Sequence, residues 1–241
     1  MTYNEYLSIA VIAVFSIVQS IFGMGILVFG TPTLLLLGYD FPVALSYLLP
    51  ASWAVSLLQV LVFEPKRPRI PFDLYFFCLP AVGVGLFLSN IGPFLSGLNQ
   101  MIGGMLILSA AIHHWITAQH LFSSLLKHNT MLYHVIMGLV HGLTNQGGAL
   151  LAIFASRVNT GKNNIRYTVA YYYFAFNSIQ ILVLAIPMGY FNLLIAHAYT
   201  ALVSVFIYMS IGNRIFGAVS NQFFSHILAF FMLIYGIIIL V

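Results

Sequence analysis

Charged residues are scarce in this chain. Only 12 of its 241 residues are Lys, Arg, Asp or Glu, whereas 61% are hydrophobic, and the mean hydropathy is +1.02. A soluble domain carries about 25% charged residues because its surface faces water. The shortage of charge therefore excludes a soluble enzyme and a disordered chain, and it also excludes a nucleic-acid-binding protein, which needs a basic patch for its phosphate contacts. The composition indicates an integral membrane protein.

Cysteine and acidic residues are also scarce. The single cysteine, Cys78, excludes a disulfide framework and a cysteine-based metal site. None of the four acidic residues lies in the middle of an apolar segment, so the chain lacks the carboxylate relay that many proton pumps use. The spacing of His113, His114 and His120 matches no metal motif, and we expect neither a metal nor a cofactor. A Walker A motif is absent as well, which excludes ATP hydrolysis by this chain.

Long hydrophobic runs, by contrast, fill the sequence. Six segments have the length of about 20 apolar residues that a helix needs to cross a bilayer: 42–63, 71–90, 97–118, 168–187, 190–210 and 221–241. Two further stretches, 6–38 and 131–156, are interrupted at Gly23–Gly25 and at Thr144–Gly148. Glycine costs a helix about 1 kcal/mol relative to alanine, so we expect the helix to stop at both clusters. The predicted fold class is an all-α polytopic membrane protein with eight apolar elements in one transmembrane domain, 1–241.

Two topologies are open, and the positions of the basic residues distinguish them. If all eight elements cross the membrane, four of the eight Lys and Arg residues lie on each side. If the interrupted segments are re-entrant hairpins, with arms of about 12–17 residues that are too short to span, all eight lie on one face, in the loops 64–70, 119–130, 157–166 and 212–220. Basic residues concentrate in cytoplasmic loops. We therefore prefer the hairpin topology. It places the protein in the inner (cytoplasmic) membrane with its basic loops in the cytoplasm and both termini on the outer side.

The chain contains an internal repeat. Gly25 and Gly38 recur as Gly148 and Gly161 at an offset of 123 residues, and a broken segment followed by three full spans occurs twice. We place the repeats at about 1–122 and 128–241. Because each half crosses the membrane an odd number of times, the second half is inverted relative to the first. In transporters of this design the substrate binds near the bilayer midplane, at the N-terminal ends of discontinuous helices.

Glycine-containing motifs suggest a family. The run Gly23-Met24-Gly25, followed by Pro32, Gly38 and Ala44, resembles the signature of the TauE/SafE sulfite exporters, also called toluene sulfonate uptake permeases. The second half looks like the second copy of that pattern, in Gly142 … Asn145-Gln146-Gly147-Gly148 … Gly161. The end of the chain resembles the last helix of the family, in Gly212-Asn213-Arg214 … Gly236. The resemblance implies transport of a small sulfur-containing or organic anion, of the sulfite, thiosulfate, sulfonate or sulfoacetate class.

Polar residues near the two breaks are the candidate binding residues. His141, one turn before Asn145, can contact an anion, carry a proton, or bond neighbouring helices as a neutral histidine. Helix N-termini at the breaks offer backbone N–H groups to an anion, and neutral side chains add donors, although the same residue types also hold helices together. The candidate substrate-binding residues are Gln19, Ser20, Gly23, Met24, Gly25, Ser52, His141, Asn145, Gln146, Gly147, Gly148, Asn177 and Ser178.

We expect a secondary transporter for a small anion and not an enzyme. Coupling to H⁺ or Na⁺ is compatible with the sequence, because backbone carbonyls at broken helices hold Na⁺ without a carboxylate. The alternatives are an anion channel, a non-transporting partner subunit and, less favoured, an intramembrane enzyme, for which a G-x-S-x-G elbow is lacking. The expected partners are the small anion, the lipid bilayer and a second copy of the chain in a homo-oligomer, and not a nucleic acid.

Overall fold

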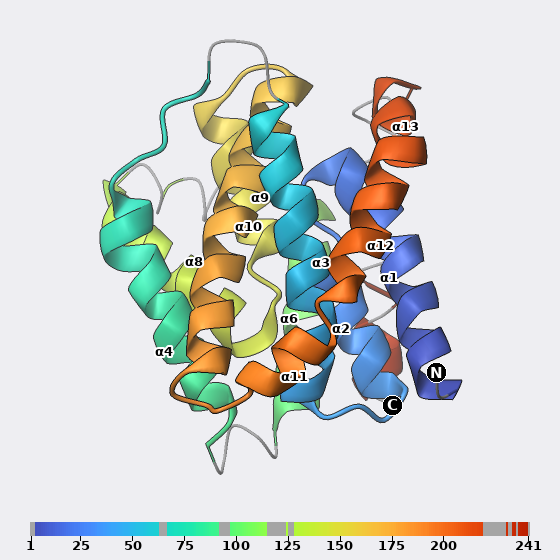
Figure 1. The fold of residues 1–241 in the computed structure, drawn as a ribbon. Helices are drawn as coiled ribbons and strands as arrows, with labels where there is room; N and C mark the ends of the chain where they lie inside the picture. Colours follow the sequence, from blue (N-terminus) through green and yellow to red (C-terminus); the bar gives the residue numbers. More distant parts are fainter. Residues whose placement is uncertain are drawn as a thin grey trace. The chain divides into compact units, whose positions relative to one another are not determined.

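The computed structural model describes residues 3–62, 67–91, 97–114, 128–218 and 236–240, together with 124, 230, 233 and 234. Every element of regular structure among these residues is a helix (Figure 1), as the composition predicted. The predicted span 221–241 lies largely outside the described residues, as do Lys66, Lys127 and His120.

Both predicted breaks are confirmed. In the first, α1 (Tyr3–Phe22) ends one residue before Gly23, and α2 (Ile26–Leu36) begins one residue after Gly25. In the second, α8 (Thr130–Thr144) and α9 (Gly148–Val158) are separated by Asn145-Gln146-Gly147. Glycine therefore ends these helices where its position in the sequence predicted.

Four helices of the described chain are long and apolar enough to cross a bilayer: Glu5–Phe22, Phe41–Leu61, Lys162–Ala185 and Tyr199–Gly217. The second and third are α3 (Phe41–Leu61) and α10 (Lys162–Ala185), which confirm the predicted spans 42–63 and 168–187. α6 (Leu98–His114) covers the described part of the predicted span 97–118 and has 17 residues. Whether the broken segments cross fully or re-enter stays a prediction.

The first arm of the first broken segment is longer than predicted. We expected arms too short to span, but α1 has 20 residues and is itself a candidate span. The helix starts before the apolar run because Glu5 lies in its first turn, where a negative charge is favoured by the helix dipole.

Two predicted spans have different bounds in the structure. The span 190–210 is interrupted, since α11 (Phe191–Ala196) ends before His197 and α12 (Tyr199–Ile207) starts after it. The apolar helix then continues through a π-helical turn, η2 (Tyr208–Gly212), into α13 (Asn213–Ala218). The span 71–90 is helical over only 16 residues, a π-helical turn η1 (Leu74–Cys78) followed by α4 (Leu79–Ser89), because the chain turns at Pro71 before the helix begins.

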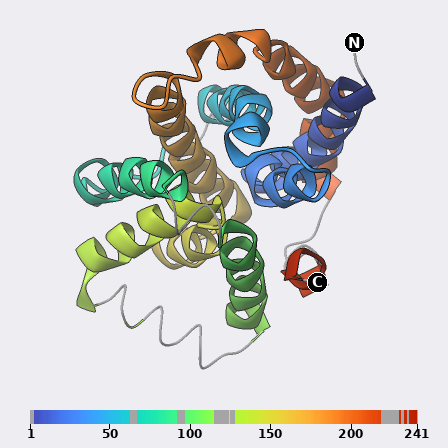
Figure 2. The same cartoon turned by 90° about the horizontal axis from the view of Figure 1, so that it is seen from below.

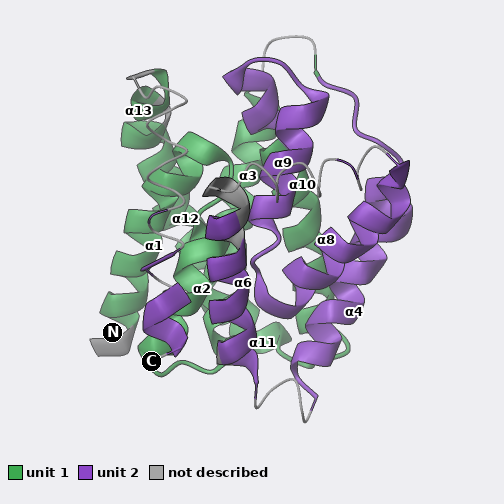
Figure 3. Ribbon diagram, turned by 180° about the vertical axis from the view of Figure 1, so that it is seen from behind, with its two compact units in different colours: residues 1–67, 169–219 green, residues 68–168, 220–241 purple. Residues whose placement is uncertain are grey.

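The described chain forms two compact units (Figure 3). Unit 1 consists of residues 1–67 and 169–219, and unit 2 of residues 68–168 and 220–241. Helix α10 contributes its first turns to unit 2 and the remainder, from Val169, to unit 1. The predicted single transporter domain and the repeat boundaries near 122 and 128 stay predictions.

Helix α3 forms the centre of unit 1. It packs against α1, α2 and α12, and 72% of its most apolar stretch is buried. In the view of Figure 2 these four helices, coloured blue and orange-brown, lie close together. Asp40 precedes the helix and Pro42 lies in its first turn, where a proline costs no hydrogen bond. α3 therefore brings its buried polar face against the end of α1 and the start of α2.

Unit 2 is built around a close contact between α4 and α8, which Figure 2 shows side by side. Small residues make the approach possible. A Cβ atom on Gly85 would lie 2.8 Å from the carbonyl oxygen of Leu139, and Cβ atoms on Gly138 and Gly142 would meet the carbonyl oxygens of Cys78 and Val82. This small-xxx-small spacing is typical of helix contacts inside membranes.

Candidate functional site

Gln19 joins the first break to α3. Its Oε1 accepts a hydrogen bond from the backbone N–H of Ile26 at 3.1 Å, which caps the start of α2 where Gly25 has no side chain to offer. Its Nε2 donates to the carbonyl oxygen of Ser52 at 2.9 Å and to Ser56 Oγ at 3.0 Å. The N–H of Ile26 can only donate and the carbonyl of Ser52 can only accept, so the contacts with these two groups fix the orientation of the Gln19 amide.

Gln59 acts on the other side of the same break. Its Nε2 donates to the carbonyl oxygens of Gln19 at 2.9 Å and Ser20 at 3.0 Å, and so caps the C-terminal end of α1. Gly23 then turns the chain with φ of 76°, a conformation that favours glycine. The two glutamines thus satisfy the end of α1 and the start of α2 from inside unit 1.

Two further candidate residues, Asn177 and Ser178 on α10, have different surroundings. Asn177 is fully buried, and its Nδ2 donates to Ser52 Oγ at 2.9 Å, so it belongs to the polar network of Gln19. Ser178 Oγ instead accepts from Trp53 Nε1 at 3.0 Å and donates to the carbonyl oxygen of Phe174. The structure therefore brings together Gln19, Ser52 and Asn177, while Ser178 forms a separate pair with Trp53.

The remaining candidates of the first break are buried in tightly packed surroundings. A Cβ atom on Gly25 would lie 2.8 Å from the backbone nitrogen of Gln19 and 2.9 Å from Val18 Cγ1, so the end of α1 fills the space beside this glycine. Met24 is 2% exposed. Ser20 Oγ donates to the carbonyl oxygen of Ser16. It also packs so closely against Gly212 that a Cβ atom on Gly212 would clash with it.

The second break lies in unit 2 and has a different geometry. Asn145 ends α8 in the left-handed conformation, with φ of 60°, and its N–H donates to the carbonyl oxygen of His141 at 2.8 Å. Thr144 Oγ1 accepts from the N–H of Gln146 at 3.2 Å. Gly147 allows the chain to return close to α8, because a Cβ atom there would lie 2.6 Å from His141 Cβ.

Helix α9 starts at this break without a side-chain cap from its N-cap residue, Gly147. The N–H groups of a first helical turn have no acceptor within the helix, and they carry the positive end of the helix dipole. His141 and Asn145 are fully buried beside this turn, and Gln146 is 2% exposed. The second break thus combines the first turn of α9, which its N-cap residue does not cap, with buried polar side chains, whereas Gln19 caps the start of α2 at the first break.

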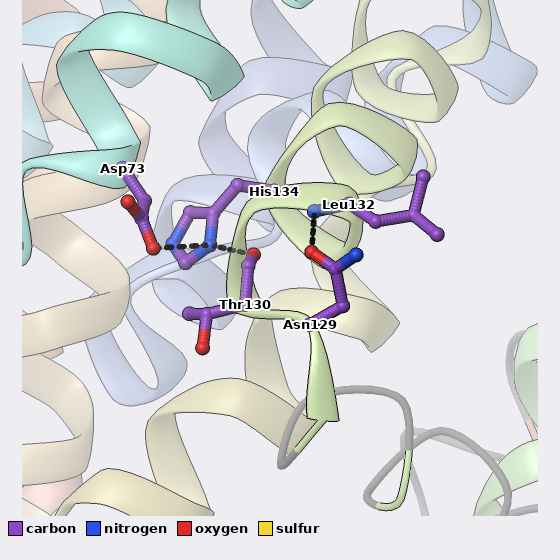
Figure 4. Close-up of polar contacts among 5 residues, drawn as sticks. All are labelled: Asp73, Asn129, Thr130, Leu132 and His134. Atoms are coloured by element: carbon purple, nitrogen blue, oxygen red, sulfur yellow. Dashed lines mark hydrogen bonds and ion pairs between the residues drawn. The ribbon is translucent and has the colours of Figure 1, made fainter.

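Unit 2 also contains an ionisable pair that the sequence did not single out (Figure 4). His134 Nδ1 lies 2.8 Å from the carbonyl oxygen of Thr130 and 4.0 Å from Asp73 Oδ2. Asn129 Oδ1 accepts from the N–H of Leu132 and caps the start of α8. This pair lies near the beginning of α8 and the break lies at its other end, so the carboxylate is remote from the candidate site.

Unit 1 holds a second histidine in a polar environment. His197 Nδ1 lies 2.7 Å from Ser46 Oγ, and its ring stacks on Tyr47 with 3.5 Å between the centroids. Ser46 gives its single proton to the carbonyl oxygen of Val43, so the Nδ1–H of His197 is the donor to Ser46. Burial lowers the pKa of His197, and the charge of Glu5 acts in the opposite direction. His197 precedes the span Tyr199–Gly217, and nothing in its local sequence indicated this role.

Clusters of metal ligands are lacking in the described part of the chain. No group of three or more His, Cys, Asp or Glu side chains there could hold a metal ion. The side chains of His113, His114 and His120 lie outside the described residues.

Comparison with known families identifies the chain. The family model described as Sulfite exporter TauE/SafE matches residues 8–239. The chain belongs to the TauE/SafE family. Members of this family are membrane transporters, so this protein is a multi-pass transporter of a small anion in a lipid membrane and not an enzyme. No significant match was found among curated proteins or among solved structures.

Proposed function

We propose that this TauE/SafE protein is a secondary transporter of a small sulfur-containing or organic anion of the sulfite, thiosulfate, sulfonate or sulfoacetate class. The observation that carries the proposal is the second break, where the N-cap residue of α9, Gly147, contributes no side-chain cap and buried polar residues lie beside the first turn. A helix N-terminus binds anions through its backbone N–H groups, and the binding needs no positively charged side chain. This fits a chain whose apolar segments contain so few charges.

In this proposal the two breaks have different roles. The anion binds to the first turn of α9, where Gly148 has no side chain to cover the backbone, with the buried polar residues His141, Asn145 and Gln146 beside it. In unit 1, Gln19, Ser52 and Asn177 hold the start of α2 in place. The proposed contribution of the other unit 1 candidates is to form this break and its surroundings: Ser20, Gly23, Met24, Gly25 and Ser178.

Uptake of labelled sulfite and thiosulfate into proteoliposomes tests the transport function. We expect saturable flux and counterflow for at least one of these anions or for a sulfonate. A flux that does not saturate and shows no counterflow would support the channel alternative. If no sulfur oxyanion or small organic acid moves at all, the proposed function is wrong.

A glycine pair tests where the anion binds. Gly148→Leu places a side chain over the first turn of α9, and we expect it to abolish the rise in melting temperature that the transported anion causes. Gly104→Leu is the matched control, because a Cβ atom on the helical Gly104 meets nothing within 4 Å. If the anion still stabilises a folded Gly148→Leu protein, the anion does not bind at the first turn of α9.

The proposed orientation has both termini outside and the basic loops in the cytoplasm. Cysteines introduced by Leu37→Cys and Asn163→Cys report on it, because both positions are accessible to solvent and the native Cys78 is fully buried. The re-entrant topology predicts that a membrane-impermeant maleimide, added from outside to intact cells, labels position 37 alone. Labelling of both positions from the same side would require the broken segments to cross fully.

A further inference from the structure

The polar network of unit 1 has unused acceptors. The amide nitrogens of Gln19, Gln59 and Asn177 each donate a hydrogen bond within the unit. By contrast, Gln59 Oε1 and Asn177 Oδ1 are buried and have no hydrogen-bond partner among the residues that the structure describes. Buried amide oxygens are normally paired, because leaving one unpaired costs about 1–3 kcal/mol.

The orientation of the Gln59 amide is not arbitrary. Its Nε2 donates to two carbonyl oxygens, those of Gln19 and Ser20, which only accept. Rotating the amide by 180° would place its oxygen against two other oxygens. Gln59 is 3% exposed, so its Oε1 is held away from water, and the described residues offer it no donor.

The position of this oxygen favours a cation. The Gln59 amide lies at the C-terminal end of α1, where the last carbonyl groups carry the negative end of the helix dipole. The last turn of α1 contains no basic residue to neutralise them. Interrupted helices in transporters hold Na⁺ at such ends through backbone carbonyl oxygens.

The chemistry of the ligands selects the kind of cation. The described ligands at this end are neutral amide and backbone oxygens, and none of the three acidic residues whose positions are described belongs to the Gln19–Ser52–Gln59–Asn177 network. Hard cations prefer oxygen ligands, but divalent ions are usually bound with carboxylates to balance their charge. A site whose described ligands include no carboxylate therefore fits a monovalent ion.

We propose that unit 1 binds Na⁺ at Gln59 Oε1, at the C-terminal end of α1, as the coupling ion of the transporter. The role as a coupling ion rests on the transport function proposed above. The binding of Na⁺ itself needs no substrate.

Thermal unfolding of the purified protein without any anionic substrate tests the site. We compare sodium chloride with choline chloride at equal ionic strength, so that chloride and screening are constant. A Na⁺ concentration several times the Kd is expected to raise the melting temperature by about 2–4 °C for a chain of this size. Equal melting temperatures in the two salts would overturn the proposal.

Two substitutions then locate the ion. Gln59→Lys keeps donors for the carbonyl oxygens of Gln19 and Ser20 and supplies a positive charge of its own, so we expect a folded protein whose melting temperature no longer responds to Na⁺. Gln59→Leu removes both functions and is expected to lower the melting temperature and to abolish the response. Loss of the response in Asn177→Leu together with its persistence in Gln59→Lys would place the ion at α10 and overturn the proposal.

Ser204→Ala is the matched control. Ser204 is fully buried in the same unit and donates to the carbonyl oxygens of Ala51 and Ala201, so its loss removes buried hydrogen bonds away from Gln59. We expect this variant to be less stable but to keep the full Na⁺ response. A Na⁺ response without anion flux in proteoliposomes would support the cation site while contradicting the transport function, and flux that is equal in Na⁺ and choline would contradict the coupling.

Discussion

Gln19 Oε1 accepts a hydrogen bond from the backbone N–H of Ile26, seven residues later, across the break between α1 and α2. One amide therefore caps the second helix of a broken segment from within the first. The N-cap residues of both second helices, Gly25 of α2 and Gly147 of α9, contribute no side-chain cap themselves. Two breaks that look alike in the sequence differ in what they leave available to a ligand.

Gln19→Leu tests the cap. The substitution removes the donor and the acceptor that join Ile26, Ser52 and Ser56, and it leaves buried polar groups unpaired. We expect a loss of about 2–4 kcal/mol in the free energy of unfolding, measured by denaturant unfolding in detergent. Ser16→Ala is the control, since Ser16 Oγ donates to the carbonyl oxygen of Ile12 in its own helix, and it should cost about 1 kcal/mol or less. Equal losses would show that the Gln19 network contributes nothing special.

Gly25→Ala tests whether packing explains the first glycine cluster. The new Cβ atom would lie 2.8 Å from the backbone nitrogen of Gln19, and backbone atoms cannot move aside easily. We expect a loss of about 1–3 kcal/mol from overpacking. In Gly217→Ala the Cβ atom meets nothing within 4 Å, and this variant should be neutral or slightly more stable. A Gly25→Ala protein as stable as the wild type would show that the space beside Gly25 is open.

Gly142→Leu tests the contact between α4 and α8. A Cβ atom at this position would meet the carbonyl oxygen of Val82 and would lie 2.9 Å from the backbone nitrogen of Leu86. We expect the two helices to separate and the melting temperature to fall by several degrees, as for a cost of about 2 kcal/mol or more. Gly104→Leu on α6 should change it little. An unchanged melting temperature in Gly142→Leu would contradict the close approach.

His197 predicts a pH dependence of stability. Burial lowers its pKa below the ordinary value of 6.5, so the unfolded chain takes up this proton more readily than the folded one. Stability from this group is therefore complete above about pH 6.5 and is lost as the pH falls through the lowered pKa. His197→Asn should flatten the dependence of the melting temperature on pH between about pH 5 and 7. An identical profile in His197→Asn would assign the effect to other groups.

The sequence located the helix breaks well because they depend on local chemistry. Clusters of glycine with polar residues end helices at Gly23–Gly25 and Asn145–Gly147 through their own backbone conformations, so both breaks were predictable to within a residue or two. The interruption at His197 was not predictable in this way. It coincides with a hydrogen bond to Ser46, which is 151 residues away in the chain.

The candidate site likewise contains residues that the sequence predicted and one that it missed. The pattern of polar residues at membrane depth found Gln19, Ser52 and Asn177, which the structure joins in one network. It missed Gln59, although Ser52, Ser56 and Gln59 share one face of α3 at intervals of four and three residues. A glutamine near the end of a long apolar helix resembles an interfacial residue until the partner helix is known.

The amino-acid sequence by itself determined that this is an all-helical membrane transporter of the TauE/SafE family with two broken helices. These properties follow from composition, from hydrophobic length and from glycine positions, which act locally. Only the tertiary structure decided that Gln19 caps α2, that Gln59 caps α1 and that two amide oxygens remain buried without partners among the described residues. Hydrogen bonds between distant side chains depend on how helices pack, and a residue's position in the chain does not encode which of its donors and acceptors the fold will use.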